Sequence, residues 1–336
     1  MINVFIYAAN AVLPIVLLIG LGYLLKQRNF YDDKFLKTAN KLGFRVALPM
    51  LLFYNVYQID NLSSINWNNV VYAVVMILVL FVVGLVITLS FCKDDRQKGV
   101  ILQSSFRSNF AIIGIPLAQA LGGDETLAIV SVLSAFSIAI FNVLAVISLT
   151  VFIKDENKKS PAVGVIALKI CKNPLIIAIM TGVVCLVVRN ALPLNEYGEP
   201  LFTIKNQLPF LHSAISTLSK MASPLMLIVL GGQFSFKSIS GLRKQIILGT
   251  LMRIVLAPAV GVGCAVILGD KLLLSAPDYA AYIALFGSPI AVSSAVMAAE
   301  MDNDAELAGQ LVVWTSVGSV ITVFLGAVLL KMFNIL

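Results

Sequence analysis

Two short segments of the chain share a pattern that suits the binding of a small solute inside a membrane. Each is a Gly-x-Pro within an apolar stretch, Gly114-Ile115-Pro116 in the first half of the chain and Gly287-Ser288-Pro289 in the second. A proline inside a helix removes a backbone donor and frees a carbonyl, and free backbone groups are tolerated in a membrane only beside protein or a cavity. Because paired interruptions of this kind mark the binding sites of transporters, we predict that these residues line a substrate site.

Polar side chains near the two interruptions are expected to complete this site. Asn109 lies seven residues before Pro116, about two helical turns, and its amide carries donors and an acceptor. It could bind a carboxylate beside freed backbone N–H groups, where the N-terminus of a half-helix adds positive potential. Ser293 lies just after the second interruption and is a further candidate. The alternative is that these side chains only form hydrogen bonds between helices.

Four basic residues lie in or beside apolar stretches, namely Arg45, Arg107, Lys220 and Arg253. A buried cation is costly and usually faces a cavity or a partner, so one interpretation is a positive vestibule that attracts anionic substrates. The other is that the long side chains reach the cytoplasmic surface. Arg253 lies eight residues into its apolar stretch, from where it too could reach that surface.

Several other kinds of chemistry find no support in the sequence. No Asp lies in the middle of an apolar stretch, which argues against a cation exchanger with paired carboxylates. The single histidine, His212, favours neither a metal site nor a proton relay, and the four cysteines lack metal-binding spacing. Nucleophile motifs and nucleotide-binding loops are missing as well. We therefore expect no enzymatic activity, no metal and no cofactor.

The elements that must position these residues are membrane-spanning helices. The chain is 59% hydrophobic and 12% charged, with a mean hydropathy of +0.96, whereas soluble domains carry about 25% charged residues. Many apolar runs reach the roughly 20 residues that span a bilayer, and they lack the alternation of membrane strands. The sequence therefore predicts an all-α integral membrane protein with ten spans: 3–25, 36–57, 70–92, 99–121, 126–153, 165–188, 207–233, 245–268, 279–300 and 306–332.

The charged residues predict how these spans are oriented. The net charge of +7 comes mainly from short loops near residues 26–41, 93–98, 154–159 and 237–244, which indicates membrane topology rather than a nucleic-acid partner. Because positive loops stay in the cytoplasm, both termini are predicted to lie outside. We interpret residues 1–153 and 162–336 as two repeats of five spans, joined by a cytoplasmic link at 154–161. An odd number of spans per repeat inverts the second one, which is a recurrent plan of transporters.

In chain order, these motifs resemble those of the auxin efflux carrier family, which includes plant PIN proteins and bacterial malate or malonate permeases. The matching pieces are Leu13-Pro14, Ala47-Leu48-Pro49, Asn109 with Gly114-x-Pro116, Asn173-Pro174, Pro224-Leu225, and Pro289 with Ala299-Glu300. They extend over essentially the whole chain. The link between the halves is short, as in bacterial-type members rather than in the long plant carriers.

The resemblance implies a fold and a mechanism. The fold would be the ten-helix, bile-acid-symporter-like architecture, with spans 4 and 9 broken and crossing at their prolines. Spans 3–5 and 8–10 would form a moving transport domain, and spans 1, 2, 6 and 7 a scaffold that forms a homodimer. Asn109 occupies the position of an asparagine that contacts the substrate carboxylate in plant members.

The resulting functional hypothesis is an elevator-type secondary transporter in the cell membrane. It would carry small organic carboxylates such as malate, malonate or auxin-like acids, with H⁺, Na⁺ or only the membrane potential as driving force. The alternatives are an ion-coupled symporter of another small organic solute, an anion channel, which would conduct without saturation, and a membrane-embedded enzyme, which would need clustered Asp, His or Arg residues.

Overall fold

The computed structural model describes residues 2–58, 67–153, 164, 168, 171–193, 200–236, 239–333 and 335–336, with only the backbone for residues 2–12 and 15. The described residues form helices and no strand. Six helical stretches are long and apolar enough to cross a membrane: Trp67–Phe91, Asp95–Val151, Pro174–Ala191, Pro209–Gln233, Ile239–Leu272 and Ala305–Met332. The prediction of an all-helical fold is therefore confirmed for the described residues, and the six apolar stretches are consistent with an integral membrane protein. The predicted link at 154–161 lies outside the described residues.

The first half of the chain contains six α-helices and two short π-helical segments among its described residues. These elements are α1 (Ile2–Gln27), α2 (Asp33–Leu42), η1 (Gly43–Ala47), α3 (Leu48–Tyr57), α4 (Trp67–Phe91), α5 (Asp95–Phe106), η2 (Phe110–Gly114) and α6 (Ile115–Val151). The predicted stretch 126–153 lies in α6 up to Val151. This helix changes direction at Gly123, whose φ of 69° and ψ of −155° suit a residue without a Cβ atom.

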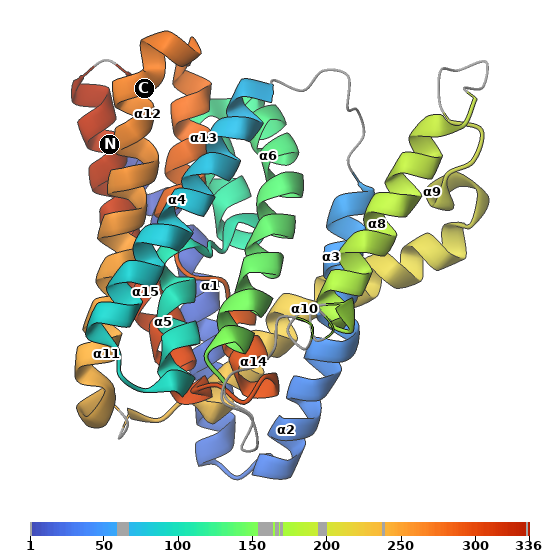
Figure 1. Cartoon of the computed structure of the whole chain (residues 1–336). Coiled ribbons are helices and arrows are strands. Elements are labelled where there is room, and N and C mark those ends of the chain that lie inside the picture. The colour runs from blue at the N-terminus through green and yellow to red at the C-terminus, as the bar shows by residue number, and fades with distance from the viewer. Residues whose placement is uncertain are drawn as a thin grey trace.

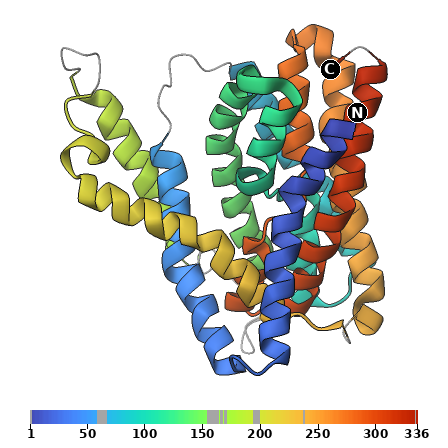
Figure 2. The ribbon, with the colours of Figure 1, turned by 180° about the vertical axis from the view of Figure 1, so that it is seen from behind.

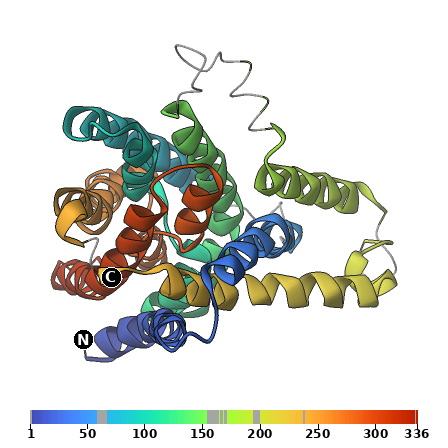
Figure 3. The ribbon, with the colours of Figure 1, turned by 90° about the horizontal axis from the view of Figure 1, so that it is seen from below.

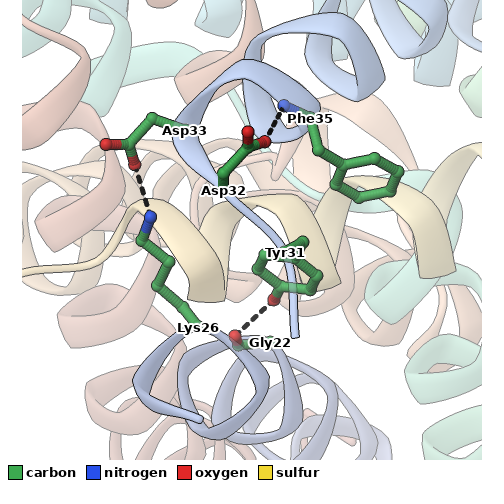
Figure 4. A network of polar contacts seen from close by, with 6 residues as sticks. All are labelled: Gly22, Lys26, Tyr31, Asp32, Asp33 and Phe35. Atoms are coloured by element: carbon green, nitrogen blue, oxygen red, sulfur yellow. Dashed lines mark hydrogen bonds and ion pairs between the residues drawn. The ribbon is translucent and has the colours of Figure 1, made fainter. Parts of the chain in front are cut away.

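The turn between α1 and α2 is held by polar contacts at its surface (Figure 4). Lys26 forms a 2.6 Å ion pair with Asp33, and Tyr31 donates a hydrogen bond to the Gly22 carbonyl. Asp32 is the N-cap of α2, and its carboxylate accepts a 2.7 Å bond from the Phe35 backbone N–H. Such a cap satisfies one of the free donors in the first turn of a helix.

The second half follows with nine elements that the structure describes. They are α8 (Pro174–Ala191), α9 (Ile204–Gln207), α10 (Pro209–Gln233), α11 (Ile239–Leu251), η4 (Met252–Leu256), α12 (Ala257–Leu272), α13 (Ala276–Gly287), α14 (Ser293–Glu300) and α15 (Ala305–Met332). Part of the predicted stretch 165–188 lies outside the described residues. Helix α1 begins and α15 ends at the same end of the helical body (Figures 1 and 2).

The three π-helical segments each end two residues before a proline, namely Pro49, Pro116 and Pro258. A proline cannot donate to the carbonyl four residues earlier and its ring clashes with that carbonyl, and the wider π turn relieves this conflict. The helix therefore continues through Pro116, which is exposed. The prediction that this span breaks at Pro116 is wrong, because its break lies at residues 107–109. The second break, at residues 288–292, does include Pro289.

The helices pack into a body with a projecting arm. Helix α1 lies along α10, where Gly22 and Gly231 let the two backbones approach so closely that a Cβ atom at either position would clash with a carbonyl of the other helix. Small residues at such contacts are typical of membrane helices. Helix α3 packs against both α8 and α10, and α8 with the nearby part of α10 projects from the body (Figures 1 and 3).

The buried apolar side chains form two clusters. One joins α4, α5, α6, α12, α13 and α15, and these helices make up most of the body in Figure 1. The other joins α1, α3, α8 and α10 to α14 and to parts of α5, α6 and α15. The two broken segments lie where these clusters meet, so packing from both sides fixes their position.

Candidate functional site

The two broken segments contact each other directly. The Asn109 backbone N–H donates a 2.8 Å hydrogen bond to the Pro289 carbonyl. Arg107 (ψ 114°) ends α5 in an extended conformation, and Ser288 (ψ 150°) ends α13 in the same way. The extended conformation of Ser288 is what a following proline favours. The Asn109 backbone N–H, which follows the end of α5, is thus satisfied by a carbonyl of the other broken segment.

A cavity of about 60 Å³ lies beside this crossing, with room for a few water molecules or a small anionic group. Its apolar walls come from α3, α6, α8 and α10, together with residues of η2 and of the second break. Its polar lining residues are Asn55, Arg107, Ser108, Asn109, Asn142, Ser223 and Ser293.

Arg107 brings a buried positive charge to the cavity. Its side chain is 1% exposed. Nη1 donates to Gln103 Oε1 at 2.7 Å and contacts Met297 Sδ at 2.9 Å, and Nη2 donates to Asn142 Oδ1 at 3.1 Å and Ser293 Oγ at 2.7 Å. All four acceptors are neutral, and no carboxylate of the described residues lies within 4 Å. The charge is therefore uncompensated, which makes the cavity attractive to an anion.

Two further donors at the first break lack partners. The Asn109 side-chain Nδ2 and the Ser108 hydroxyl are buried and form no hydrogen bond within the described part of the chain. A buried donor without a partner costs about 1–3 kcal/mol, so such groups favour a bound molecule that can accept their hydrogen bonds. Because both residues line the cavity next to Arg107, the three side chains together present a site for an anionic oxygen.

Arg253 lies at the other break and away from the cavity lining. It is fully buried, so the interpretation in which it reaches the cytoplasmic surface is wrong. Its Nε donates to the Ser288 carbonyl at 2.8 Å, and its Nη2 donates to the carbonyls of Phe286 at 2.6 Å and Leu285 at 3.3 Å. The last carbonyls of a helix have no donor within that helix, and Arg253 supplies donors for those of α13.

The other predicted site residues are distributed unevenly around the cavity. Ser293 lines it, whereas Gly114, Ile115 and Pro116 lie beyond its lining, and Gly114 packs closely against Phe110 and the Ala284 carbonyl. Gly287, Ser288 and Pro289 are buried behind it, and the Ser288 hydroxyl donates to the Ala284 carbonyl at 2.6 Å. Arg45 and Lys220 are exposed and lie outside the cavity lining.

Sequence reasoning missed Asn142 and Ser108, both of which are buried at the cavity. Asn142 carries a usable signal, because it is an amide in the middle of the apolar stretch 126–153, where a polar side chain needs a partner. Ser108 carries none, because its importance depends on the break falling at residues 107–109.

Comparison with known proteins identifies the family to which the chain belongs. A family model described as membrane transport protein matches residues 7–325, so the chain belongs to this family of membrane transporters, which is of the auxin efflux carrier type. An uncharacterized transporter of Methanothermobacter thermautotrophicus is 22% identical over 330 residues, which cover 97% of this chain and all of the relative. The resemblance found in the sequence motifs is thereby confirmed.

Proposed function

We propose that the protein is a secondary transporter of small organic carboxylate anions, which bind in the cavity beside the crossing. The observation that carries this proposal is the uncompensated guanidinium of Arg107 next to the unused donors of Ser108 and Asn109. A carboxylate presents two oxygens that accept several hydrogen bonds, and its charge neutralises that of Arg107. The same arrangement disfavours cations and gives neutral solutes no electrostatic gain.

The composition of the cavity favours acids with one carboxylate and an apolar remainder. Arg107 is the one cation among the residues that line it, and most of the wall is aliphatic or aromatic. A second carboxylate, as in malate or malonate, would find no second cation in this wall, and burying its charge uncompensated is costly. We therefore expect small monocarboxylic acids to bind more tightly than dicarboxylic acids.

We further propose an elevator-type mechanism on a fold of ten spans in two inverted repeats, residues 1–153 and 162–336. The scaffold would contain α1, α2, α3, α8 and α10, and the transport domain α4–α6 and α11–α15. The cavity supports this division, because residues of α3, α8 and α10 line it together with residues of α6, η2 and the two breaks. An even number of spans agrees with termini at one end of the body. Termini outside the cell membrane and a homodimer formed by the scaffold belong to the same proposal.

The proposal is tested by uptake into proteoliposomes. Radiolabelled mono- and dicarboxylates are offered to the purified protein with and without Na⁺ and proton gradients. We expect saturable uptake of at least one monocarboxylate, with empty liposomes and the Arg45→Gln variant, altered at an exposed position, as controls. Absence of saturable carboxylate uptake would contradict the proposal, and flux that rises linearly with concentration would indicate a channel.

A further inference from the structure

The carbonyl end of α13 is a place where a cation is strongly favoured. The last turn of a helix carries free carbonyls and the negative end of the helix dipole. In transporters with broken helices, such carbonyl ends coordinate Na⁺ or other coupling cations. Here α13 ends at Gly287, directly before the second break, inside the protein and close to the proposed anion site.

A side chain of this protein already provides the positive charge at that place. The Arg253 guanidinium donates to the carbonyls of Leu285, Phe286 and Ser288 at 3.3, 2.6 and 2.8 Å. Within the described residues no carboxylate lies within 4 Å of it, so the carbonyl end of α13 is its electrostatic partner. Guanidinium charge is retained in proteins even when it is buried.

Local structure brings Arg253 to this position. Arg253 lies in η4, the π-helical segment that precedes Pro258, and a π turn changes the direction in which the following side chains point. Eight residues later, Gly261 packs against the Phe286 ring, where a Cβ atom would clash. The missing side chain lets α12 approach α13 closely, which keeps the carbonyls within reach of Arg253.

We propose that Arg253 is a built-in cation of the crossing, which takes the place that a bound alkali cation would otherwise occupy at the end of α13. Arg253 then acts as a positioning residue: it holds the second break in the shape on which the anion site depends, and it makes Na⁺ unnecessary there. The consequence for transport rests on the proposed function, whereas the structural role of the cation does not.

The first test needs no substrate. We expect Arg253→Ala to lower the melting temperature of the purified protein in detergent. Guanidinium ion, added well below denaturing concentrations, should restore much of this loss, whereas tetramethylammonium at equal ionic strength should not. The wild type should melt at the same temperature in Na⁺ and in choline. Arg243→Ala, which removes an exposed arginine of α11, is the matched control and should behave like the wild type.

Three results would overturn the proposal: an Arg253→Ala variant as stable as the wild type, a destabilised variant that guanidinium does not restore, or a wild type that Na⁺ stabilises saturably. Where Arg253→Ala fails to fold, the same comparison is made between Arg253→Lys and Arg253→Met. Lysine keeps the charge, so Arg253→Lys should be clearly the more stable of the two, and equal stability would contradict the proposal.

The second test measures uptake by Arg253→Lys in Na⁺ and in choline. Losing a hydrogen bond to a charged group lowers an equilibrium constant roughly tenfold or more. We expect the maximal rate of uptake to fall by this factor while KM stays unchanged. If Arg253 only stabilised the fold, the variant would contain less active protein. Its maximal rate per folded carrier and its KM would then both equal those of the wild type. Failure of every carboxylate in uptake, with the guanidinium restoration intact, would refute the proposed substrate and leave the role of Arg253 standing.

Discussion

The two breaks of this protein look alike in the sequence but differ in how their polar groups are used. At the first break, the side-chain donors of Ser108 and Asn109 are buried without partners in the described part of the chain, and both residues line a cavity that also borders Arg107. At the second, Arg253 satisfies the carbonyls that end α13, and the Ile290 backbone N–H donates to Thr315 Oγ1 at 3.2 Å. At the first break the unused donors belong to residues that line a cavity. At the second, the carbonyls that end α13 are satisfied by Arg253, although Arg253 Nη1 and the Ser294 hydroxyl form no hydrogen bond in the described part of the chain.

This difference shows that an interruption of a membrane helix is not by itself a binding site. Free backbone groups can be satisfied by a neighbouring side chain as well as by a solute. What separates the two cases is the balance of donors and charge around each break. Two arginines with almost the same burial therefore have different roles, because one borders a cavity and the other borders carbonyl oxygens.

The largest effect is expected from removing the charge at the first break. Arg107→Gln keeps a polar side chain but leaves a bound carboxylate without its counter-charge. Truncating one partner of a buried, hydrogen-bonded charge pair costs about 2–5 kcal/mol, so the affinity for the transported anion should fall by roughly 30-fold or more. Binding is measured by calorimetry on protein with a verified melting curve.

Arg107→Lys is the matched variant for this experiment. It keeps the charge but not the planar arrangement of donors, so its affinity should lie between those of the wild type and Arg107→Gln. A folded Arg107→Gln variant with unchanged affinity would show that the charge at the first break does not serve binding.

Replacing the two prolines should change the stability of the protein by a smaller amount, and in opposite directions at the two positions. Pro116→Ala restores an N–H in a continuous helix and should raise stability by about 1 kcal/mol. Pro289→Ala removes the restriction that keeps Ser288 extended and should lower stability by about 0.4–1 kcal/mol. Melting temperatures of both variants, measured in the same detergent, check the prediction. Equal losses at both positions would mean that Pro116 also terminates a helix.

The smallest effect is expected far from both breaks, at the Lys26–Asp33 pair. The hydrogen bond and charge of Lys26 lower the pKa of Asp33. A lowered pKa in the folded state stabilises the protein only above the unfolded value, near 3.9, and this contribution disappears as the pH falls through the folded pKa. Because Asp33 is exposed, solvent screens the pair.

Melting curves of Asp33→Asn and the wild type should therefore almost coincide at neutral pH and become identical in acid. This variant serves as the baseline for the other substitutions. A large loss of stability at neutral pH would show that the Lys26–Asp33 pair contributes more to stability than expected of a solvent-exposed ion pair.

Much of the architecture could be predicted from the sequence, because apolar runs determine which segments enter the membrane. Asn109 and Ser293, which were predicted from their distance from the two prolines, both line the cavity. The prediction of Arg107 as a cation near this place followed from its position in an apolar stretch. The position of the first break could not be predicted, because the π turn at η2 lets the helix pass Pro116. The role of Arg253 was equally hidden, since its partners lie 32–35 residues away in the chain.

The central claim, that the first break binds the anion, is tested most directly by the affinity of Asn109 variants. With the carboxylate identified by uptake, binding and melting temperature are measured for the wild type, Asn109→Ala, Asn109→Asp and the exposed control Asn190→Ala. Losing a hydrogen bond to a charged group costs about 1.5–3 kcal/mol, so Asn109→Ala should bind roughly 10- to 100-fold more weakly. Asn109→Asp should bind more weakly still, because it places a like charge beside the anion, while Asn190→Ala should equal the wild type. A well-folded Asn109→Ala variant with wild-type affinity would contradict the claim and remove the first break from the binding site.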